Sequence, residues 1–310
     1  MKHVILGAGG AVGNALTAEL LENGQTVRLV SRRGYSKDGT EVLKGDLTNA
    51  VDCEKALEGV DIAHLCVGLP YDRKVWAEQW PVLMKNCIEA CKKQEVKLIF
   101  FDNVYMYGNV QGKMTEDTPY NPCSVKGNVR FKLTRMLEDA MNAGRIQAII
   151  ARASDIYGPY GEKTSMPWLM VFDKLLQNKK PQWLFNAEAT HSFTYIPDIA
   201  KGIRMLSECE DCFGQTWHLP TYNPAPTGKE FIEMAARELA KETKFDVLKM
   251  WIVKMVGLVN KTVKELPEMA YQFERDFYFD STKFNKYFDY RPVSYKDGIK
   301  ETIAFLQNQK

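Results

Sequence analysis

The sequence predicts an α/β fold in which a doubly wound parallel sheet is joined to a smaller C-terminal α/β lobe. Short apolar runs alternate with helical patterns through the first half of the chain, which is typical of strand–helix–strand units and a parallel sheet. A glycine-rich segment follows the first apolar run and opens the first helical pattern. The 310 residues, of which 45% are hydrophobic and 26% charged, suffice for one large globular domain or two moderate ones.

The elements of the first half follow one another in regular order. The expected strands are Val4–Leu6, Thr26–Val30, Glu41–Lys44, Ile62–Val67, Lys97–Phe101 and Gln147–Arg152. The first helix carries apolar residues at helical spacing and ends at Gly24. The later helices are expected at Cys53–Leu57, Trp80–Lys92 and Phe131–Met141. Strands that are joined by helices pair in parallel, so this order predicts an open sheet with helices packed on its faces.

The loop between the first strand and the first helix has the pattern G-x-x-G-x-x-G over residues 7–13. Gly7 permits a tight turn off the strand, Gly10 lets backbone amides approach a pyrophosphate, and Gly13 lets the helix pack against the sheet. The start of the helix adds free N–H groups and a positive dipole end. The segment therefore predicts a Rossmann dinucleotide site. Its expected members are Gly7, Gly9, Gly10, Ala11, Val12 and Gly13.

The end of the second strand bears on the choice between NAD and NADP. NAD-binding proteins usually place an acid there for the ribose 2′-OH, whereas this strand ends in Ser31, Arg32 and Arg33, with no acid before Asp38. An arginine pairs with a 2′-phosphate that an acid would repel. The sequence therefore predicts NADP rather than NAD, bound by Ser31 and Arg32. Four further residues at strand ends are expected beside the cofactor: Asp46, Leu47, Cys66 and Val67.

The pattern becomes less regular after residue 155, where prolines and glycines cluster. Trp217–Pro220 and Phe277–Asp280 are expected to be short strands, and Lys229–Lys241 a helix. These features predict a dinucleotide-binding domain over residues 1–155, to which residues 190–215 return. A substrate-binding lobe covers most of residues 156–310.

Charge and hydropathy argue against several classes of partner. The formal net charge is only +2, from 41 basic and 39 acidic residues, so the molecule as a whole has no strong electrostatic attraction to nucleic acid or anionic lipid. The apolar start Val4–Leu6 is too short for a signal peptide. The most apolar helical stretch, Met250–Val259, is short and interrupted by Lys254, and is expected to be a buried or interface helix. We therefore expect neither a nucleic-acid nor a membrane partner.

Cysteine and histidine usage suggests a reducing compartment and no metal site. The seven cysteines are odd in number and scattered, which predicts free thiols and a cytoplasmic protein. Cys209 and Cys212 have the spacing of a redox or zinc half-site, but no second pair of ligands stands at suitable spacing. The four histidines are also too scattered for a metal cluster.

Several motifs beyond the glycine loop point to a known family. They are Gly45–Leu47, Asp61–Leu65, Val104–Gly108, Tyr157–Gly161 and Phe193–Ala200. With them, most of the chain resembles the extended short-chain dehydrogenase/reductase family, the NAD(P)-dependent sugar epimerases and dehydratases. The resemblance implies a Rossmann domain followed by a C-terminal substrate lobe. It also implies a Ser or Thr after the fifth strand and a Tyr-x-x-x-Lys pair on the next helix.

This chain departs from that catalytic pattern. Counting back from Gly108 puts Asn103 at the Ser/Thr position. Lys132 fits the family lysine, which would hold the nicotinamide ribose, but Asn128 stands four residues before it. An amide is neither an acid nor a base near neutral pH. The resemblance is therefore to the atypical branch of the family, whose members lack the Tyr.

Other side chains are candidates for the missing proton transfer and for substrate binding. Tyr105, Tyr107 and Lys126 are the first candidates for the proton, because they flank the carboxyl edge of the sheet where ligands bind. The alternative for Tyr107 is a packing role. Candidate substrate residues are Asn103, Arg152 and His191, and the alternative for His191 is that it orders a loop.

Two functions of different classes stay open on the sequence. The first is an NAD(P)-dependent epimerase/dehydratase-like oxidoreductase that acts on a small polar substrate, with a nucleotide-sugar as the candidate. Hydride would pass between nicotinamide C4 and a substrate carbon, with a non-standard proton donor. The alternative is a non-catalytic NADP-binding redox sensor or scaffold, which the missing Tyr favours. By analogy with the family, the helices Trp80–Lys92 and Phe131–Met141 are candidates for a homodimer contact.

Overall fold

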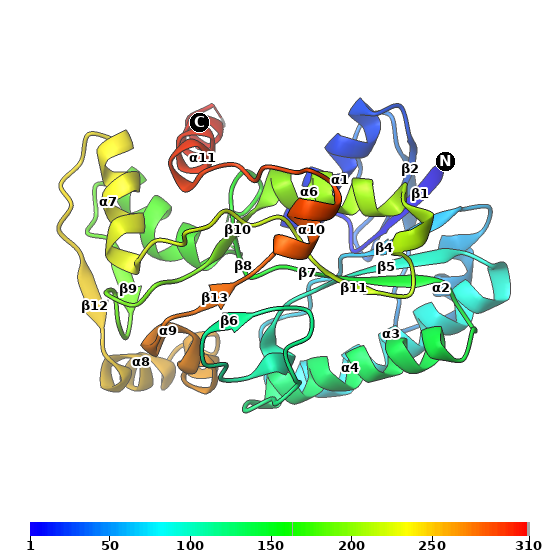
Figure 1. Cartoon of the computed structure of the whole chain (residues 1–310), viewed down its shortest axis with the longest axis horizontal. Coiled ribbons are helices and arrows are strands. Elements are labelled where there is room, and N and C mark those ends of the chain that lie inside the picture. Colours follow the sequence, from blue (N-terminus) through cyan, green and yellow to red (C-terminus); the bar gives the residue numbers. More distant parts are fainter. Residues whose placement is uncertain (163, 309–310) are drawn as a thin grey trace.

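The centre of the computed structural model, which describes residues 1–162 and 164–308, is a seven-stranded parallel sheet. The strand order is β11-β7-β5-β4-β1-β2-β3 (Figure 1). The strands are β1 (Lys2–Leu6), β2 (Thr26–Ser31), β3 (Glu41–Lys44), β4 (Ile62–Leu65), β5 (Lys97–Asp102), β7 (Ala148–Arg152) and β11 (Thr216–His218). This architecture confirms the predicted Rossmann α/β fold. The predicted strand near Trp217 is β11, which pairs with β7 at the edge of this sheet.

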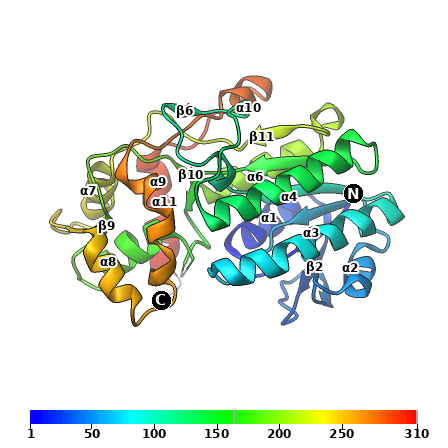
Figure 2. The same ribbon diagram turned by 90° about the horizontal axis from the view of Figure 1, so that it is seen from below.

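Helices cover both faces of the sheet. Packed on one face are α2 (Ala50–Leu57), α3 (Arg73–Gln94) and α4 (Val125–Asn142). Packed on the other are α1 (Ala11–Glu22), α6 (Ile196–Ser207) and α10 (Thr282–Tyr287) (Figures 1 and 2). Alternation along β1 supplies both cores, because Val4 and Leu6 belong to one and Ile5 to the other. The central strands are buried on both faces, which explains why their sequences are mostly apolar, as in IAHL of β4.

Polar residues set the starts of α3 and α4. The Asp72 side chain accepts hydrogen bonds from the backbone N–H groups of Lys74 and Val75, so α3 begins at Arg73 rather than near Trp80. The Ser124 hydroxyl accepts from the N–H of Gly127, so α4 begins at Val125 rather than near Phe131. Such side-chain caps satisfy N–H groups that the first turn of a helix leaves free. Both helices therefore extend further toward the carboxyl edge of the sheet.

The remaining elements form smaller pairs and the C-terminal lobe. Three two-stranded parallel pairs are β8 (Asp155–Tyr157) with β10 (Phe193–Tyr195), β9 (Gln182–Leu184) with β12 (Asp246–Leu248), and β6 (Lys113–Met114) with β13 (Tyr278–Phe279). The helices are α5 (Asp173–Leu176), α7 (Gly228–Glu238), α8 (Met250–Gly257), α9 (Tyr271–Glu274) and α11 (Tyr295–Gln307). Short 3₁₀ or π turns are η1 (Tyr105–Tyr107), η2 (Trp168–Phe172), η3 (Glu210–Cys212), η4 (Val263–Glu265) and η5 (Pro267–Met269). The lobe has its own core, which is rich in aromatic residues such as Trp183 and Phe231.

The strand order reverses between β1 and β4. From β1 the chain first builds β2 and β3 on one side, then crosses to β4, β5 and β7 on the other. In doubly wound sheets the crevice for a ligand lies outside the carboxyl ends of the strands at this reversal. The expected place for a ligand is therefore where β1 meets the glycine loop.

Two expectations from composition have a structural outcome. Cys209 and Cys212 are joined in a disulfide with Cα atoms 5.4 Å apart, so the expectation of free thiols is wrong for this pair. Within residues 1–162 and 164–308, none of the helices combines the length and the apolar character that crossing a bilayer demands.

Buried histidines should make the fold sensitive to acid. Burial lowers the pKa of His3 to about 4, lowers that of the adjacent His64 well below its usual value, and lowers that of His218 to about 3. The unfolded chain takes up protons near pH 6.5, which the folded chain does not, so stability is present above pH 6.5 and is lost as the pH falls. His3 alone should remove about 2–3 kcal/mol between pH 7 and pH 4.5, measured by urea unfolding.

The control replaces the stacked pair, in which His3 Nδ1 lies 2.9 Å from His64 Nε2. In a His3→Gln/His64→Gln variant, the free energy of unfolding should depend less on pH over the same range. An equal pH dependence in both proteins would contradict the assignment to these rings.

Candidate cofactor and active site

The glycine loop is built for close approach of the backbone. Gly7 has φ +97°, and a Cβ atom there would lie 2.6 Å from Val67 Cα. A Cβ on Gly13 would lie 3.3 Å from both the Gly7 carbonyl oxygen and Ile5 Cγ2. The N–H groups of Gly7 and Ala8 both donate to the Val30 carbonyl oxygen at 3.0 Å. The loop is therefore held between β2 and β4, with α1 packed closely behind it.

The start of α1 suits a phosphate. Its N-cap residue is Gly10, which supplies no side-chain cap to the first turn. The N–H groups of Ala11, Val12 and Gly13 lie in that turn, where they have no partner within the helix. Together with the helix dipole they form a site for an anion. The pyrophosphate of a dinucleotide fits these residues, because the backbone at Gly10 is open: a Cβ atom there would meet only the Gly7 carbonyl oxygen, at 3.6 Å.

A residue that the sequence analysis did not include lies over this loop. The Tyr35 ring is 3.2 Å from a Cβ atom built on Gly9, and the Tyr35 N–H donates to the Ser31 hydroxyl at 2.8 Å. The segment after β2 therefore folds back onto the glycine loop. The sequence offers one indication of this contact, an aromatic residue shortly after the second strand.

The expected adenosine end of the site lies at the ends of β2 and β3. Arg32 and Arg33 are exposed, and Leu47 is buried. The Asp46 carboxylate accepts hydrogen bonds from the Thr48 N–H and hydroxyl at 3.0 and 2.8 Å. These bonds and the positive charge of Arg32 lower the pKa of Asp46. The Cys66 thiol is buried, which raises its pKa to about 12 and keeps it protonated.

The ends of β5 and α4 meet at the same edge. The Asn103 amide oxygen accepts from the Tyr105 N–H at 3.1 Å and so begins the turn η1. A Cβ on Gly127 would lie 2.7 Å from the Tyr105 carbonyl oxygen, so only glycine allows α4 to pack this closely. The packing brings Lys126, in the first turn of α4, to the carboxyl edge of the sheet.

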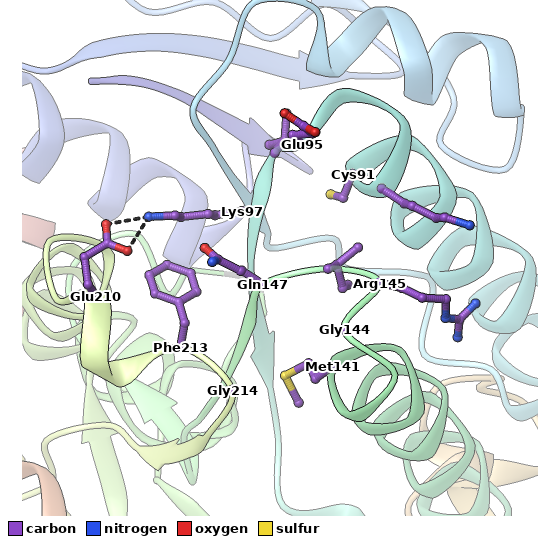
Figure 3. A pocket seen from close by; sticks show the side chains of 13 residues that line it. Cys91, Glu95, Lys97, Met141, Gly144, Arg145, Gln147, Glu210, Phe213 and Gly214 are labelled. Carbon is purple, nitrogen blue, oxygen red and sulfur yellow. Dashed lines mark hydrogen bonds and ion pairs between the residues drawn. The ribbon is translucent and has the colours of Figure 1, made fainter.

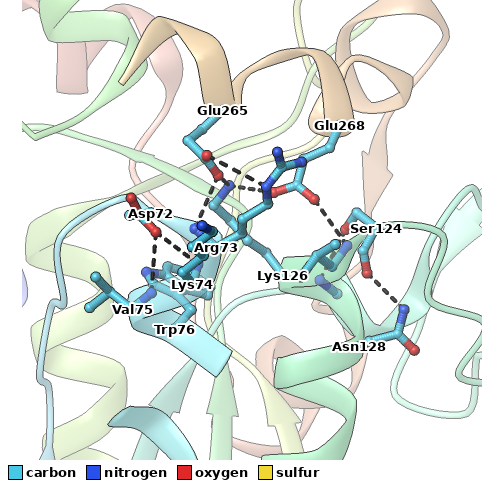
Figure 4. A network of polar contacts seen from close by, with 12 residues as sticks. Asp72, Arg73, Lys74, Val75, Trp76, Ser124, Lys126, Asn128, Glu265 and Glu268 are labelled. Carbon is cyan, nitrogen blue, oxygen red and sulfur yellow. Dashed lines mark hydrogen bonds and ion pairs between the residues drawn. The ribbon is translucent and has the colours of Figure 1, made fainter. Parts of the chain in front are cut away.

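Lys126 is fully buried in a cluster of opposite charge (Figure 4). Its Nζ atom lies 2.6 Å from a Glu265 carboxylate oxygen and also contacts the carboxylate of Glu268. It lies 4.3 Å from the centre of the Tyr71 ring. Glu265 also accepts from the backbone N–H of Arg73, at 3.1 Å. The segment between α8 and α9 is thereby joined to the starts of α3 and α4.

The structure places Lys132 apart from this cluster. Lys132 is exposed, whereas Lys126 and Arg130, four residues apart, both point inward. Two residues turn a helix by about 200°, so Arg130 and Lys132 cannot share a face. The Arg130 guanidinium lies 4.3 Å from the Trp80 ring centre. Its Nη1 atom pairs with the Asp102 carboxylate at 3.3 Å, whereas its Nε atom has no partner among the described residues. Lys132 accordingly has no part in the site we propose.

Two tyrosines lie beside this cluster, Tyr71 and Tyr105. They flank Trp76, whose ring is edge-on to Tyr71 and stacked with Tyr105. Burial raises the pKa of both phenols above their usual value. They therefore stay protonated near neutral pH, and each can donate a hydrogen bond to a ligand oxygen.

Tyr107 and Arg152 belong to a closed interior network. The Tyr107 hydroxyl lies 2.8 Å from His218 Nε2 and accepts from Arg152 at 2.7 Å. Arg152 is fully buried and also pairs with Asp102 and donates to Tyr120. Both residues follow or end strands, as expected, but their polar atoms are satisfied inside the protein. We leave both out of the proposed site.

His191 is enclosed between two aromatic rings. Its ring stacks on Phe273 and Phe277 with centres 4.5 and 4.6 Å away. Its Nε2 lies 2.9 Å from the Asp155 carboxylate. The negative charge of Asp155 contributes to the raised pKa values of Tyr71 and Tyr105. His191 therefore holds the Asp155 carboxylate in place through this contact.

Comparison with known proteins identifies the family. Residues 3–215 match the model of the NAD dependent epimerase/dehydratase family. The chain belongs to this family. An uncharacterized UDP-glucose epimerase, YtcB, of Bacillus subtilis is 22% identical over 338 residues, which cover 99% of this chain and 98% of the relative. A sterol-4-alpha-carboxylate 3-dehydrogenase of Mus musculus is 22% identical over 97% of this chain and 90% of its own length.

Solved structures of family members have the same fold. UDP-glucuronic acid 4-epimerase from Bacillus cereus, in complex with NAD, superposes with a TM-score of 0.82 at 19% identity and covers 100% of this chain and 99% of its own. The dTDP-glucose 4,6-dehydratase from Bacillus anthracis, also in complex with NAD, gives a TM-score of 0.82 at 16% identity and covers 100% and 97%. The comparison supports the fold along the whole chain, the Rossmann sheet together with the C-terminal lobe.

The structure of this chain has a separate hollow, which lies at the edge of the sheet opposite to the glycine loop and Lys126. It has a volume of about 700 Å³ and lies at the amino ends of β5 and β7 (Figure 3). Lys97 and Glu210 pair beside it at 2.6 Å. It is remote from the strand ends that carry the glycine loop and Lys126, so it plays no part in the site. Within the described part of the chain, three or more potential metal-ligating side chains do not gather anywhere.

Proposed function

We propose that the chain is an NAD(P)-dependent oxidoreductase that acts on a small polar substrate, with a nucleotide-sugar as its class. The observation that carries the proposal is a buried lysine, Lys126, at the carboxyl edge of a Rossmann sheet whose glycine loop fits a pyrophosphate. A bound nicotinamide would supply a hydride donor or acceptor at its C4 atom. The glycine loop would hold its phosphates, and the end of β2 its adenosine ribose.

Lys126 and Arg130 have the spacing of the family's Tyr-x-x-x-Lys pair and share one face of α4. We therefore assign Lys126 to the place of the tyrosine and Arg130 to that of the lysine. In reduction, the Lys126 ammonium group would donate a proton to the substrate oxygen that becomes a hydroxyl. In the reverse direction, the proton would return from that hydroxyl to the Lys126 nitrogen. Asn103 and the Tyr105 phenol would orient the same oxygen.

The carboxylates of Glu265 and Glu268 hold the Lys126 ammonium group in position. The Nε atom of Arg130, which has no partner among the described residues, suits a hydroxyl of a nicotinamide ribose. The substrate class rests on the relatives, because the names of several refer to nucleotide-sugars. The homodimer through α3 and α4 stays a prediction, which sedimentation equilibrium would test.

Calorimetric titration with NADP⁺, NADPH, NAD⁺ and NADH tests the proposal first, followed by a screen of nucleotide-sugars for nicotinamide absorbance changes. Binding with turnover supports the oxidoreductase. Binding of the oxidised and reduced forms with unequal affinity and no turnover would support the sensor or scaffold. That second candidate is favoured by the ion pairs that already engage Lys126. Binding of none of the four would end both.

Arg32 should determine the preference for NADP. Because one charge-assisted hydrogen bond contributes about 1.5–3 kcal/mol, Arg32→Ala should weaken NADP⁺ binding by about ten- to hundredfold and leave NAD⁺ binding nearly unchanged. Arg291→Ala, which removes an exposed arginine of the C-terminal segment, is the matched control. Equal losses for NADP⁺ and NAD⁺ in Arg32→Ala would contradict the assignment.

A further inference from the structure

Helix α8 presents an apolar face outward. Trp251, Met255, Leu258 and Val259 are 61%, 61%, 86% and 89% exposed, and their spacing puts them on one side of the helix and its first following turn. Val253, on the opposite side, is buried in the lobe core. Both views show α8 at the outer edge of the C-terminal lobe (Figures 1 and 2). The expected buried or interface helix is thus buried on one side only.

The charged residues of the α8 segment are all basic, and the acids that flank it, Asp246 and Glu265, pair with Lys180 and Lys126. Residues 247–264 contain four lysines and no Asp or Glu, although the whole chain has a net charge of only +2. The four are Lys249, Lys254, Lys261 and Lys264, and all are exposed. None of them forms an ion pair with another of the residues that the structure describes. We name Trp251, Met255, Leu258, Val259 and these four lysines the α8 surface.

We propose that the α8 surface binds the surface of an anionic lipid bilayer. Exposed tryptophan and aliphatic side chains settle at the depth of the headgroups, and flanking lysines are attracted to anionic lipids. Lysine side chains can also keep their charge in water while their stems cover apolar surface. The attachment is peripheral, at the interface. It departs from the expectation that the chain has no membrane partner.

The charge pattern argues against a second copy on the same surface. A two-fold contact would bring the four lysines of each α8 surface together with no acid between them. Like charges that are brought together at an interface repel each other, and they repel more strongly as water is excluded. An anionic bilayer, in contrast, neutralises all four.

Vesicle sedimentation with the full-length protein tests the proposal. The protein should bind phosphatidylcholine vesicles that contain phosphatidylglycerol, bind weakly to pure phosphatidylcholine, and dissociate at high salt. Each lysine near the surface contributes about fivefold to partitioning, so Lys249→Gln/Lys254→Gln should weaken binding by about 25-fold. Leu258→Asp/Val259→Asp should abolish binding. The matched controls are Lys296→Gln/Lys300→Gln on α11 and Val51→Asp on α2, where Val51 is 58% exposed.

Three results would overturn the proposal. The first is no binding to anionic vesicles, and the second is equal binding to neutral and anionic vesicles. The third is a native oligomer that Leu258→Asp/Val259→Asp converts to monomers, which would assign the surface to self-association. The lysine variants replace exposed side chains only, so they keep the test decisive even where the aspartate variant fails to fold.

Discussion

Asp102→Ala is expected to destabilise the protein by about 3–5 kcal/mol, the loss that follows when one partner of a buried ion pair is removed. Asp102 is fully buried at the end of β5, with its carboxylate 3.3 Å from Arg130 and 3.4 Å from Arg152. Burial raises the pKa of this carboxyl group, and the two guanidinium groups oppose that rise. Removal of the carboxylate leaves two buried positive charges without a counter-charge. Urea unfolding monitored by far-ultraviolet circular dichroism would measure the loss.

A surface acid is the control for this experiment. Asp139 on α4 pairs with Arg135 at 3.7 Å, and both side chains are exposed. Asp139→Ala should change the free energy of unfolding by no more than about 1 kcal/mol, because water screens such pairs. Similar losses in the two variants would show that burial of the arginines does not decide the effect of Asp102→Ala.

The sheet could be predicted because its strands are buried on both faces. Val4–Leu6 and Ile62–Leu65 are apolar runs of a length that suits strands, and the elements between them have the helical period. The starts of α3 and α4 could not be predicted in the same way. Their first turns mix charged or polar residues with only a few apolar ones, such as Trp76 in α3 and Val125 in α4, so the apolar period is weak there. The local signals were the caps Asp72 and Ser124, which spacing alone does not distinguish from loop residues.

The same distinction holds for the candidate site, whose local features could be predicted and whose long-range contacts could not. The glycine loop is a local feature, since seven consecutive residues carry the turn, the close approach and the helix start. Lys126 acquires its environment from Glu265 and Glu268, about 140 residues away, and no spacing in the sequence relates them. Lys126 and Arg130 lie on the buried face of α4, and Lys132 lies two residues beyond Arg130, which turns it by about 200° to the exposed face.

The sequence also could not predict that the charge of Arg152 is neutralised inside the protein. Arg152 ends a strand at the edge where ligands bind, which predicts a substrate contact. Its guanidinium is instead enclosed by Asp102, Tyr107 and Tyr120. Each of these partners comes from a segment that sequence reasoning treated separately. The general lesson is that strand ends predict where a site lies, and burial decides which side chains reach it.

Lys126→Met is expected to lower turnover by about 10²–10⁴-fold on a nucleotide-sugar identified in the screen, with cofactor binding retained. The substitution keeps an unbranched side chain in the buried position but removes the proton-bearing nitrogen. Initial rates from nicotinamide absorbance would measure the effect. Lys132→Met, on the exposed face of the same helix, is the matched control and should leave turnover unchanged.

A second variant separates chemistry from folding. Lys126→Met leaves the buried carboxylate of Glu265 without its nearest cation, which destabilises the fold as well as the reaction. Lys126→Met/Glu265→Gln removes that charge, so its unfolding midpoint should recover toward the native value while turnover stays low. Recovery of turnover together with stability would reduce Lys126 to a structural role. Loss of activity in Lys132→Met but not in Lys126→Met would return the catalytic assignment to Lys132 and to the opposite face of α4.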